Sequence, residues 1–215
     1  MKNIKALTLA FLLSVFGSSY ALAEYGVTVG VTGSMAMIDA SGTETEGGEK
    51  TDGSVSNNAG VGSIFVEYNN IMGTAFSIGL DHVPGSADVS SSVKERADAN
   101  GEGHSGTNKA QAEIENHMTL YATYGLGNGA YIKLGYVEAD LNTLETLGTG
   151  SVYGNVTIDG FEYGAGVEFE AYAGTVGRVE LTHIAYDDIS IRSSTTRENV
   201  SPTNLREGDL DVTRL

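Results

Sequence analysis

Ionisable side chains recur at alternate positions in several segments of the chain, and they are the residue types from which a polar site is built. The set comprises Glu115, His117, Lys133, Glu162, Glu168, Glu170, Arg178 and Glu180. Successive side chains of an extended strand point to opposite faces, so residues two apart share a face. If that face is enclosed, its charges must pair or meet water, because an unpaired buried charge is costly. We predict a salt-bridged interior network; the alternative is a narrow ion path, which the excess of acid would make cation-selective.

His117 raises the question of catalysis, because it shares its face with Glu115 and Thr119. A hydrolase built on histidine needs a nucleophile and an orienting carboxylate within hydrogen-bond reach. No serine, histidine and aspartate in the chain have a spacing that indicates such a set, and the acidic clusters, such as Asp187 with Asp188, match no calcium-binding loop. We therefore predict no catalytic residue, no bound cofactor and no metal site.

The elements that position these residues are predicted to be strands. Seven segments alternate with period two: residues 24–39, 60–68, 74–82, 114–124, 130–138, 160–171 and 177–186. One face of each segment is apolar, as in Ile64, Val66 and Tyr68, while the opposite face is rich in Gly, Ala, Ser and Thr. Period two with β-branched and aromatic residues is typical of strands with one apolar face.

The connections between these segments alternate between long and short. Long polar links are expected at residues 40–58, 83–112, 141–157 and 187–208, and short turns at 69–73, 125–129 and 172–176. This rhythm is typical of strands that thread a membrane back and forth. A soluble sandwich would turn its apolar face inward and expose a charged face, whereas here the other face is small. The fold class that we predict is all-β: an eight-stranded antiparallel up-and-down transmembrane β-barrel.

Aromatic residues are predicted to form two belts at the membrane surfaces, where a ring with a polar tip suits the headgroup region. Tyr25, Tyr68 and Tyr124 lie near the short turns. At the opposite ends of their strands lie Tyr136, Phe161, Tyr163 and Tyr186.

Composition narrows the class of protein further. The chain has 215 residues, a formal net charge of −16 and no cysteine. The acidity argues against a nucleic-acid partner, and the lack of cysteine excludes a disulfide scaffold. Residues 1–23 combine a basic start, an apolar run at 6–16 and the small-residue end Ala21-Leu22-Ala23. This layout predicts a secretory signal peptide cleaved after Ala23, followed by one barrel domain over residues 24–215.

The signal segment, the alternating segments and the long-short rhythm over residues 24–186 resemble the small outer-membrane β-barrel proteins of Gram-negative bacteria, namely the OmpA transmembrane domain, OmpX and opacity-type group. The resemblance implies a monomer that is not an enzyme and lies in the outer membrane, surrounded by lipid and lipopolysaccharide after insertion by the barrel-assembly machinery. It implies a structural or surface-interaction role, adhesion- or opacity-like, in which long loops contact surface ligands above a closed polar lumen. A narrow porin-like channel for small solutes or ions is the alternative.

The end of the chain departs from the pattern of this family, whose last strand usually closes with a terminal Phe. Residues 208–215 have the sequence expected for the start of an eighth strand. Given the strand length needed to cross a membrane, we expect the last strand to be truncated by about six to ten residues.

Overall fold

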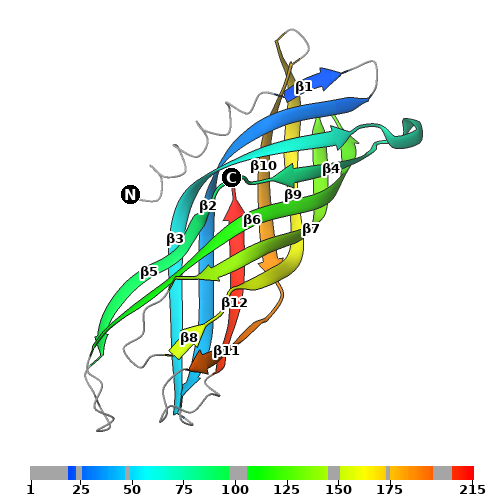
Figure 1. Ribbon diagram of the computed structural model, residues 1–215. Coiled ribbons are helices and arrows are strands. Elements are labelled where there is room, and N and C mark those ends of the chain that lie inside the picture. The colour runs from blue at the N-terminus through cyan, green and yellow to red at the C-terminus, as the bar shows by residue number, and fades with distance from the viewer. Residues whose placement is uncertain are drawn as a thin grey trace.

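The structure is a computed structural model that describes residues 19–22, 26–46, 49–96, 106–144, 151–172, 175–195 and 205–215. Its strands wrap around a common axis, and the longer ones continue beyond the barrel toward the lower end of the view (Figure 1). Among the described residues, no helix is long and apolar enough to cross a membrane.

Eight of the described strands form a closed antiparallel ring. In order around the ring they are β2 (Val27–Glu46), β3 (Glu49–Tyr68), β4 (Phe76–His82), β6 (Gly106–Gly127), β7 (Ala130–Thr143), β9 (Val156–Tyr172), β10 (Thr175–Tyr186) and β12 (Leu205–Arg214). The ring closes because β12 pairs with β2 on one side and with β10 on the other. The predicted fold class, an eight-stranded antiparallel up-and-down β-barrel, is therefore confirmed.

Four shorter strands and one turn of 3-10 helix complete the described structure. They are β1 (Ser19–Leu22), β5 (Ala87–Arg96), β8 (Ser151–Tyr153), β11 (Ile189–Thr195) and η1 (Ile71–Gly73). β5 pairs with β6, β11 pairs with β12, and β8 pairs with β11. We call the end of the barrel that carries η1 the turn side, and the end that carries β5, β8 and β11 the loop side.

The prediction of long loops is wrong over much of the loop side. Residues 40–46 and 49–58 continue β2 and β3 as a paired hairpin, and parts of the other three links form β5, β8, β11 and the start of β6. The hairpin of residues 40–46 and 49–58 lacks the alternating apolar face by which a strand is predicted, and its described side chains are exposed or half-buried. The hairpin pairs nonetheless, since it continues the ladder between β2 and β3 that is already formed in the wall.

The wall of the barrel separates two kinds of side chain. Large apolar residues face outward and are exposed, among them Val31, Ile64, Leu80, Leu120, Leu134, Phe161 and Leu181. Of the residues predicted for the aromatic belts, Tyr68, Tyr124, Tyr136 and Tyr163 are exposed on this outer surface, while Tyr25 lies outside the described residues. The belt assignment of Tyr186 is wrong, because Tyr186 is buried in the interior core with Ile184 and Val212.

The interior contains two layers that differ in polarity. We call the ionic side chains nearer the turn side the charged layer: Glu67, Asp81, Lys133, Glu162, Arg178, Glu180 and Arg214. We call the buried cluster nearer the loop side the apolar layer: Ala36, Ile38, Val89, Ile114, Val137, Ala139, Leu141, Ile158, Ile184, Tyr186, Leu210 and Val212. The prediction of a polar lumen therefore holds for one half of the barrel only.

Candidate functional site

Arg178 of β10 anchors one end of the charged layer. Its two terminal nitrogens bind the carboxylate of Glu67 of β3 in a bidentate pair, at 3.0 and 3.1 Å, and Nη2 also lies 2.7 Å from Oε2 of Glu168. The guanidinium lies over the rings of Phe65 and Tyr131, at 5.3 and 5.2 Å from their centroids. Arg178 therefore joins β10 to β3 across the interior, and two carboxylates and two aromatic rings compensate its charge.

Glu162 of β9 is the centre of a second ionic group. It is fully buried, and its two oxygens lie 2.7 Å from Arg214 Nη2 and 3.3 Å from Lys133 Nζ. Lys133 also binds Glu180 at 2.9 Å, and Arg214 approaches Asp81 at 3.7 Å. The group joins β4, β7, β9, β10 and β12, so it stabilises one relative register of these strands.

Glycines on the inner face make room for this packing. A Cβ added at Gly79 of β4 would collide with the ring of Tyr121, and one added at Gly166 of β9 would collide with Tyr131. Both tyrosines lie against cations of the charged layer, Tyr121 under Lys133 at 4.5 Å and Tyr131 under Arg178. The high glycine content on this face thus follows from rings and long side chains that share a narrow interior.

The structure brings most of the predicted network residues together. Lys133, Glu162, Glu168, Arg178 and Glu180 form the ion pairs described above. Glu170 lies on the same strand as Glu168 but is exposed at the turn side.

Glu115 is placed differently from the prediction, and the assignment to the interior is wrong. It pairs in register with Asp140 on the outer side of the wall, while the neighbouring pair Ile114 and Leu141 is buried inside. A bulge between Glu115 and Met118, in which Asn116 has the left-handed backbone angle φ 51°, shifts the alternation by one residue. Counting by twos from His117 fails across such a bulge.

His117 is buried between the two layers and performs no role that its contacts reveal. Neither ring nitrogen has a hydrogen-bond partner among the described residues. It lines a cavity of about 90 Å³ together with apolar-layer residues and Arg214. The described residues place no serine nucleophile on its ring, so the geometry of a catalytic set is not present there.

Three residues of the charged layer are missing from the predicted network: Glu67, Asp81 and Arg214. The period-two alternation does place Glu67 and Asp81 on the inner face, since both alternate with the apolar residues of predicted strands. Arg214 lies in the last strand, for which the sequence offered only a short alternating stretch. Its partners Glu162 and Asp81 are far away in the sequence, so pattern reading could not connect them.

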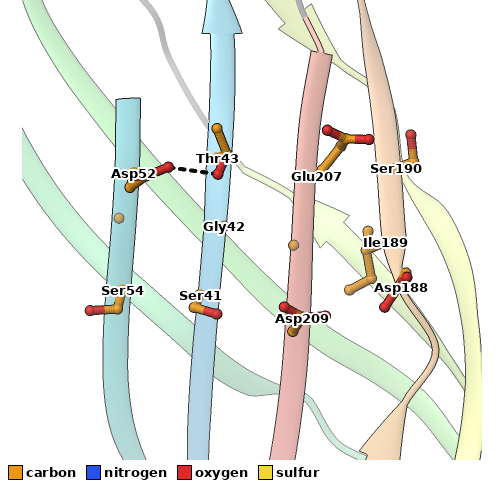
Figure 2. A pocket seen from close by; sticks show the side chains of 12 residues that line it. Ser41, Gly42, Thr43, Asp52, Ser54, Asp188, Ile189, Ser190, Glu207 and Asp209 are labelled. Atoms are coloured by element: carbon orange, nitrogen blue, oxygen red, sulfur yellow. Dashed lines mark hydrogen bonds between the residues drawn. The ribbon is translucent and has the colours of Figure 1, made fainter. Parts of the chain in front are cut away.

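The loop side carries an acidic surface. It is formed by the loop-side parts of β2, β3 and β12, by Asp188 and by the start of β11. An open hollow of about 700 Å³ is lined by Ser41, Gly42, Thr43, Asp52, Gly53, Ser54, Asp188, Ile189, Ser190, Glu207, Gly208 and Asp209. Figure 2 shows these side chains along β3, β2, β12 and the start of β11, with Asp188 just before β11 and with Thr43 donating to Asp52 at 2.7 Å. Four carboxylates and no cation line this hollow, which we call the acidic hollow. Among the described residues no group of three or more His, Asp or Glu is arranged to hold a metal ion.

A second acidic position lies above the apolar band on the outer wall. Asp140 accepts hydrogen bonds from Asn116 Nδ2 at 2.8 Å and from Thr157 Oγ1 at 3.0 Å. These two donors lower the pKa of Asp140 below its ordinary value, because they stabilise the charged carboxylate.

Taken together, the arrangement defines a closed β-barrel with a filled interior and a polar loop side. Comparison with known proteins adds little to this class. No family model and no curated protein matches the chain. One similar solved structure is Ail, the attachment invasion locus protein of Yersinia pestis, in complex with the heparin analogue sucrose octasulfate, with 12% identity, a TM-score of 0.31 and coverage of 85% of this chain and 96% of that one. A second is Ail alone, with 10% identity, a TM-score of 0.25 and the same coverage.

Proposed function

We propose that the protein is an outer-membrane β-barrel that acts through its loop side, in a structural or surface-interaction role. Export by the signal segment at residues 1–23 and insertion as a monomer among outer-membrane lipid and lipopolysaccharide by the barrel-assembly machinery belong to this proposal. The exposed apolar band around the closed ring supports the membrane location, since a bilayer is the solvent in which such a surface is stable.

The observation that carries the functional part is the filled interior. The charged layer is cross-linked by ion pairs, and the described residues of the apolar layer beyond it are mostly aliphatic, which do not replace the water around an ion. A closed interior leaves the loop side as the surface on which the protein meets its surroundings. The porin-like channel is the alternative that this packing disfavours.

Planar-bilayer conductance tests the closed interior. We expect no steady channel from the native chain. Replacing Ile38, Val137 and Ile184 of the apolar layer by Gly should admit water and produce a small cation-selective conductance. The matched control replaces Val31, Leu134 and Leu181, which face outward, and should stay closed. Steady conductance of the native chain would favour the channel.

Binding of a cationic probe tests the surface role. The acidic hollow should bind an oligolysine peptide with an affinity that falls as salt screens the charges. Replacing Asp52, Asp188, Glu207 and Asp209 by their amides should abolish this binding and leave folding unchanged, because these residues are exposed. As a control, the amide variants of Glu138 and Asp159, outside the hollow, should bind as the native chain does. Equal binding by the hollow variant would overturn the assignment of this surface.

A further inference from the structure

The ladder between β3 and the strand that follows it stops partway along the wall. The pairing of β3 with β4 ends at Ile64 and His82. Residues 83–86 then form an irregular link to β5, which pairs with β6. Within the part of the chain that the structure describes, residues 59–63 of β3 therefore pair with β2 on one side only. We call the interval between residues 59–63 and the link 83–86 the gap.

The local sequence explains why the ladder stops there. If the register of β3 and β4 continued, Pro84 would lie opposite Gly62. Proline has no N–H group to donate, so it does not extend a ladder. Val83 instead donates to the carbonyl oxygen of His117 at 2.9 Å, so the link follows β6. The gap is therefore a feature of the backbone and does not depend on the rotamer of any side chain.

A cavity of about 90 Å³ lies behind the gap. The lining residues on the side of the gap are exposed and small: Gly60, Gly62, Gly85 and Ser86. The walls that β2, β6, β10 and β12 contribute are mostly aliphatic and buried, among them Ile38, Ile114, Ile184 and Val212. Because exposed and buried residues line the same cavity, it is reached from outside the barrel through the gap.

His117 is an unsatisfied polar group in the lining of this cavity. It is only 7% exposed, and neither of its ring nitrogens has a hydrogen-bond partner among the described residues. The hydroxyl group of Tyr186, another lining residue, also lacks a partner in that part of the chain. A buried polar group without a partner is costly, and a bound molecule that supplies the missing hydrogen bond removes this cost. The cavity thus combines aliphatic walls with groups that need a polar partner.

The charges beside the cavity favour a neutral head group. Arg214 also lines the cavity, but its guanidinium already lies 2.7 Å from Glu162 and 3.7 Å from Asp81. A carboxylate would compete with Glu162 for this cation and leave one anion unpaired, and an ammonium would lie beside a like charge. A hydroxyl group carries no charge and both donates and accepts, so it can bind either nitrogen of a neutral imidazole.

We propose that this cavity binds an unbranched primary alcohol, whose hydroxyl group contacts His117 and whose chain packs on the aliphatic walls. Since a cavity of about 150 Å³ holds benzene, the cavity of about 90 Å³ holds roughly four non-hydrogen atoms of the ligand. A longer chain extends outward through the gap, whose rim consists of small residues. A water molecule on His117 would leave the aliphatic walls without contacts. The inference goes beyond the proposed function, because it depends neither on the loop side nor on conductance.

NMR of the full chain in nanodiscs of deuterated lipid tests the site, with 1-butanol as the probe. We expect saturable shifts of the His117 ring nitrogens, and nuclear Overhauser contacts from the butanol methylenes to the methyl groups of Ile114 and Val212. Leu134 and Leu181 face outward and are internal controls, whose methyl groups should respond only linearly to butanol concentration. Butyrate and butylammonium have the same chain with a charged head, and they should bind at least about tenfold more weakly.

Two variants separate the polar contact from the cavity volume. His117→Leu removes the hydrogen bond, keeps a bulky side chain, and should weaken butanol binding at least about fivefold. Ala36→Leu fills the cavity from β2 and should abolish binding, while Leu181→Ala on the outer surface should bind as the native chain does.

Three outcomes would overturn the proposal. They are equal binding by His117→Leu and the native chain, binding of butyrate as tight as that of butanol, and contacts of His117 with water that persist at saturating butanol. The last result would make the cavity a hydration site. If Ala36→Leu does not fold, His117→Leu and the series of head groups still decide, because a histidine without partners is not needed to hold the barrel together.

Discussion

The charged layer and the apolar layer fill the same barrel by different physical means. In the charged layer, Arg178 and Glu162 each bind partners from other strands at 2.7 to 3.3 Å, so the contacts depend on direction and on register. In the apolar layer, Ile38 and Ile184 contribute by volume and exclude water in any arrangement that packs well. The charged layer therefore fixes how the strands align, while the apolar layer seals the interior.

The two layers also differ in what a deletion leaves behind. Removing one member of a buried ion pair leaves an uncompensated charge, whereas removing an apolar side chain leaves a cavity. For a single side chain, the loss of unfolding free energy is larger when one member of a buried ion pair is removed. This loss depends on whether the remaining charge keeps other partners. The variants that follow compare these costs under one assay, unfolding by denaturant from lipid vesicles.

The largest effect is expected for Glu162→Ala. Arg214 would keep only the longer contact to Asp81, and Lys133 would keep Glu180, so the buried cations would be under-compensated. Breaking such a pair costs about 3–5 kcal/mol of unfolding free energy. The matched control is Glu170→Ala on the same strand, which removes an exposed carboxylate. Similar losses for both variants would show that the charged layer does not hold the wall together.

A smaller loss is expected for Ile184→Ala in the apolar layer. Ile184 is fully buried, and truncating such a side chain costs about 2–5 kcal/mol, depending on how far the site collapses. Because this substitution leaves no buried charge without its partner, the denaturant midpoint of Ile184→Ala should respond to salt as that of the native chain does. Leu181→Ala, on the outward face of the same strand, is the control and should lose less. An effect of Leu181→Ala equal to that of Ile184→Ala would contradict the assignment of the faces.

The sequence predicts the wall better than it predicts the interior. Alternation of apolar and small residues located seven strands of the ring, because lipid imposes that pattern on every strand. Alternation failed to predict structure where both faces of a strand are alike. Residues 40–46 of β2 are polar on both faces, so the hairpin was not predicted. Residues 35–38 are mostly apolar on both faces, so the apolar layer was not predicted either. Alternation also failed at the bulge beside Asn116, which turns Glu115 outward: asparagine adopts left-handed backbone more readily than most residues, but its presence alone does not locate a bulge. Partners such as Arg178 and Glu67 are joined by barrel closure, which local pattern does not encode.

Gly79→Ala examines how tightly the charged layer is packed. The added methyl group would collide with the ring of Tyr121 and displace it from Lys133. Overpacking of this kind costs about 1–3 kcal/mol. Gly60→Ala is the control, because an added Cβ there meets nothing within 4 Å. If the two variants unfold at the same denaturant concentration, the tyrosine has room to move and the charged layer is less rigid than its contacts indicate.

The smallest effect is expected outside both layers, at Asp140. Its pKa is lowered by the hydrogen bonds from Asn116 and Thr157, so the folded state favours the charged carboxylate more than the unfolded state does. The resulting stability is present above the ordinary carboxyl pKa and is lost as the pH falls through the lowered value in the folded protein. Asn116→Ala should therefore raise the pKa of Asp140 toward its ordinary value, measured by NMR titration of the side-chain carboxyl carbon. Ser56→Ala, which leaves both donors to Asp140 in place, should not change it. An unchanged titration in Asn116→Ala would mean that Thr157 alone sets the pKa, and that the bulge beside Glu115 is not held by this contact.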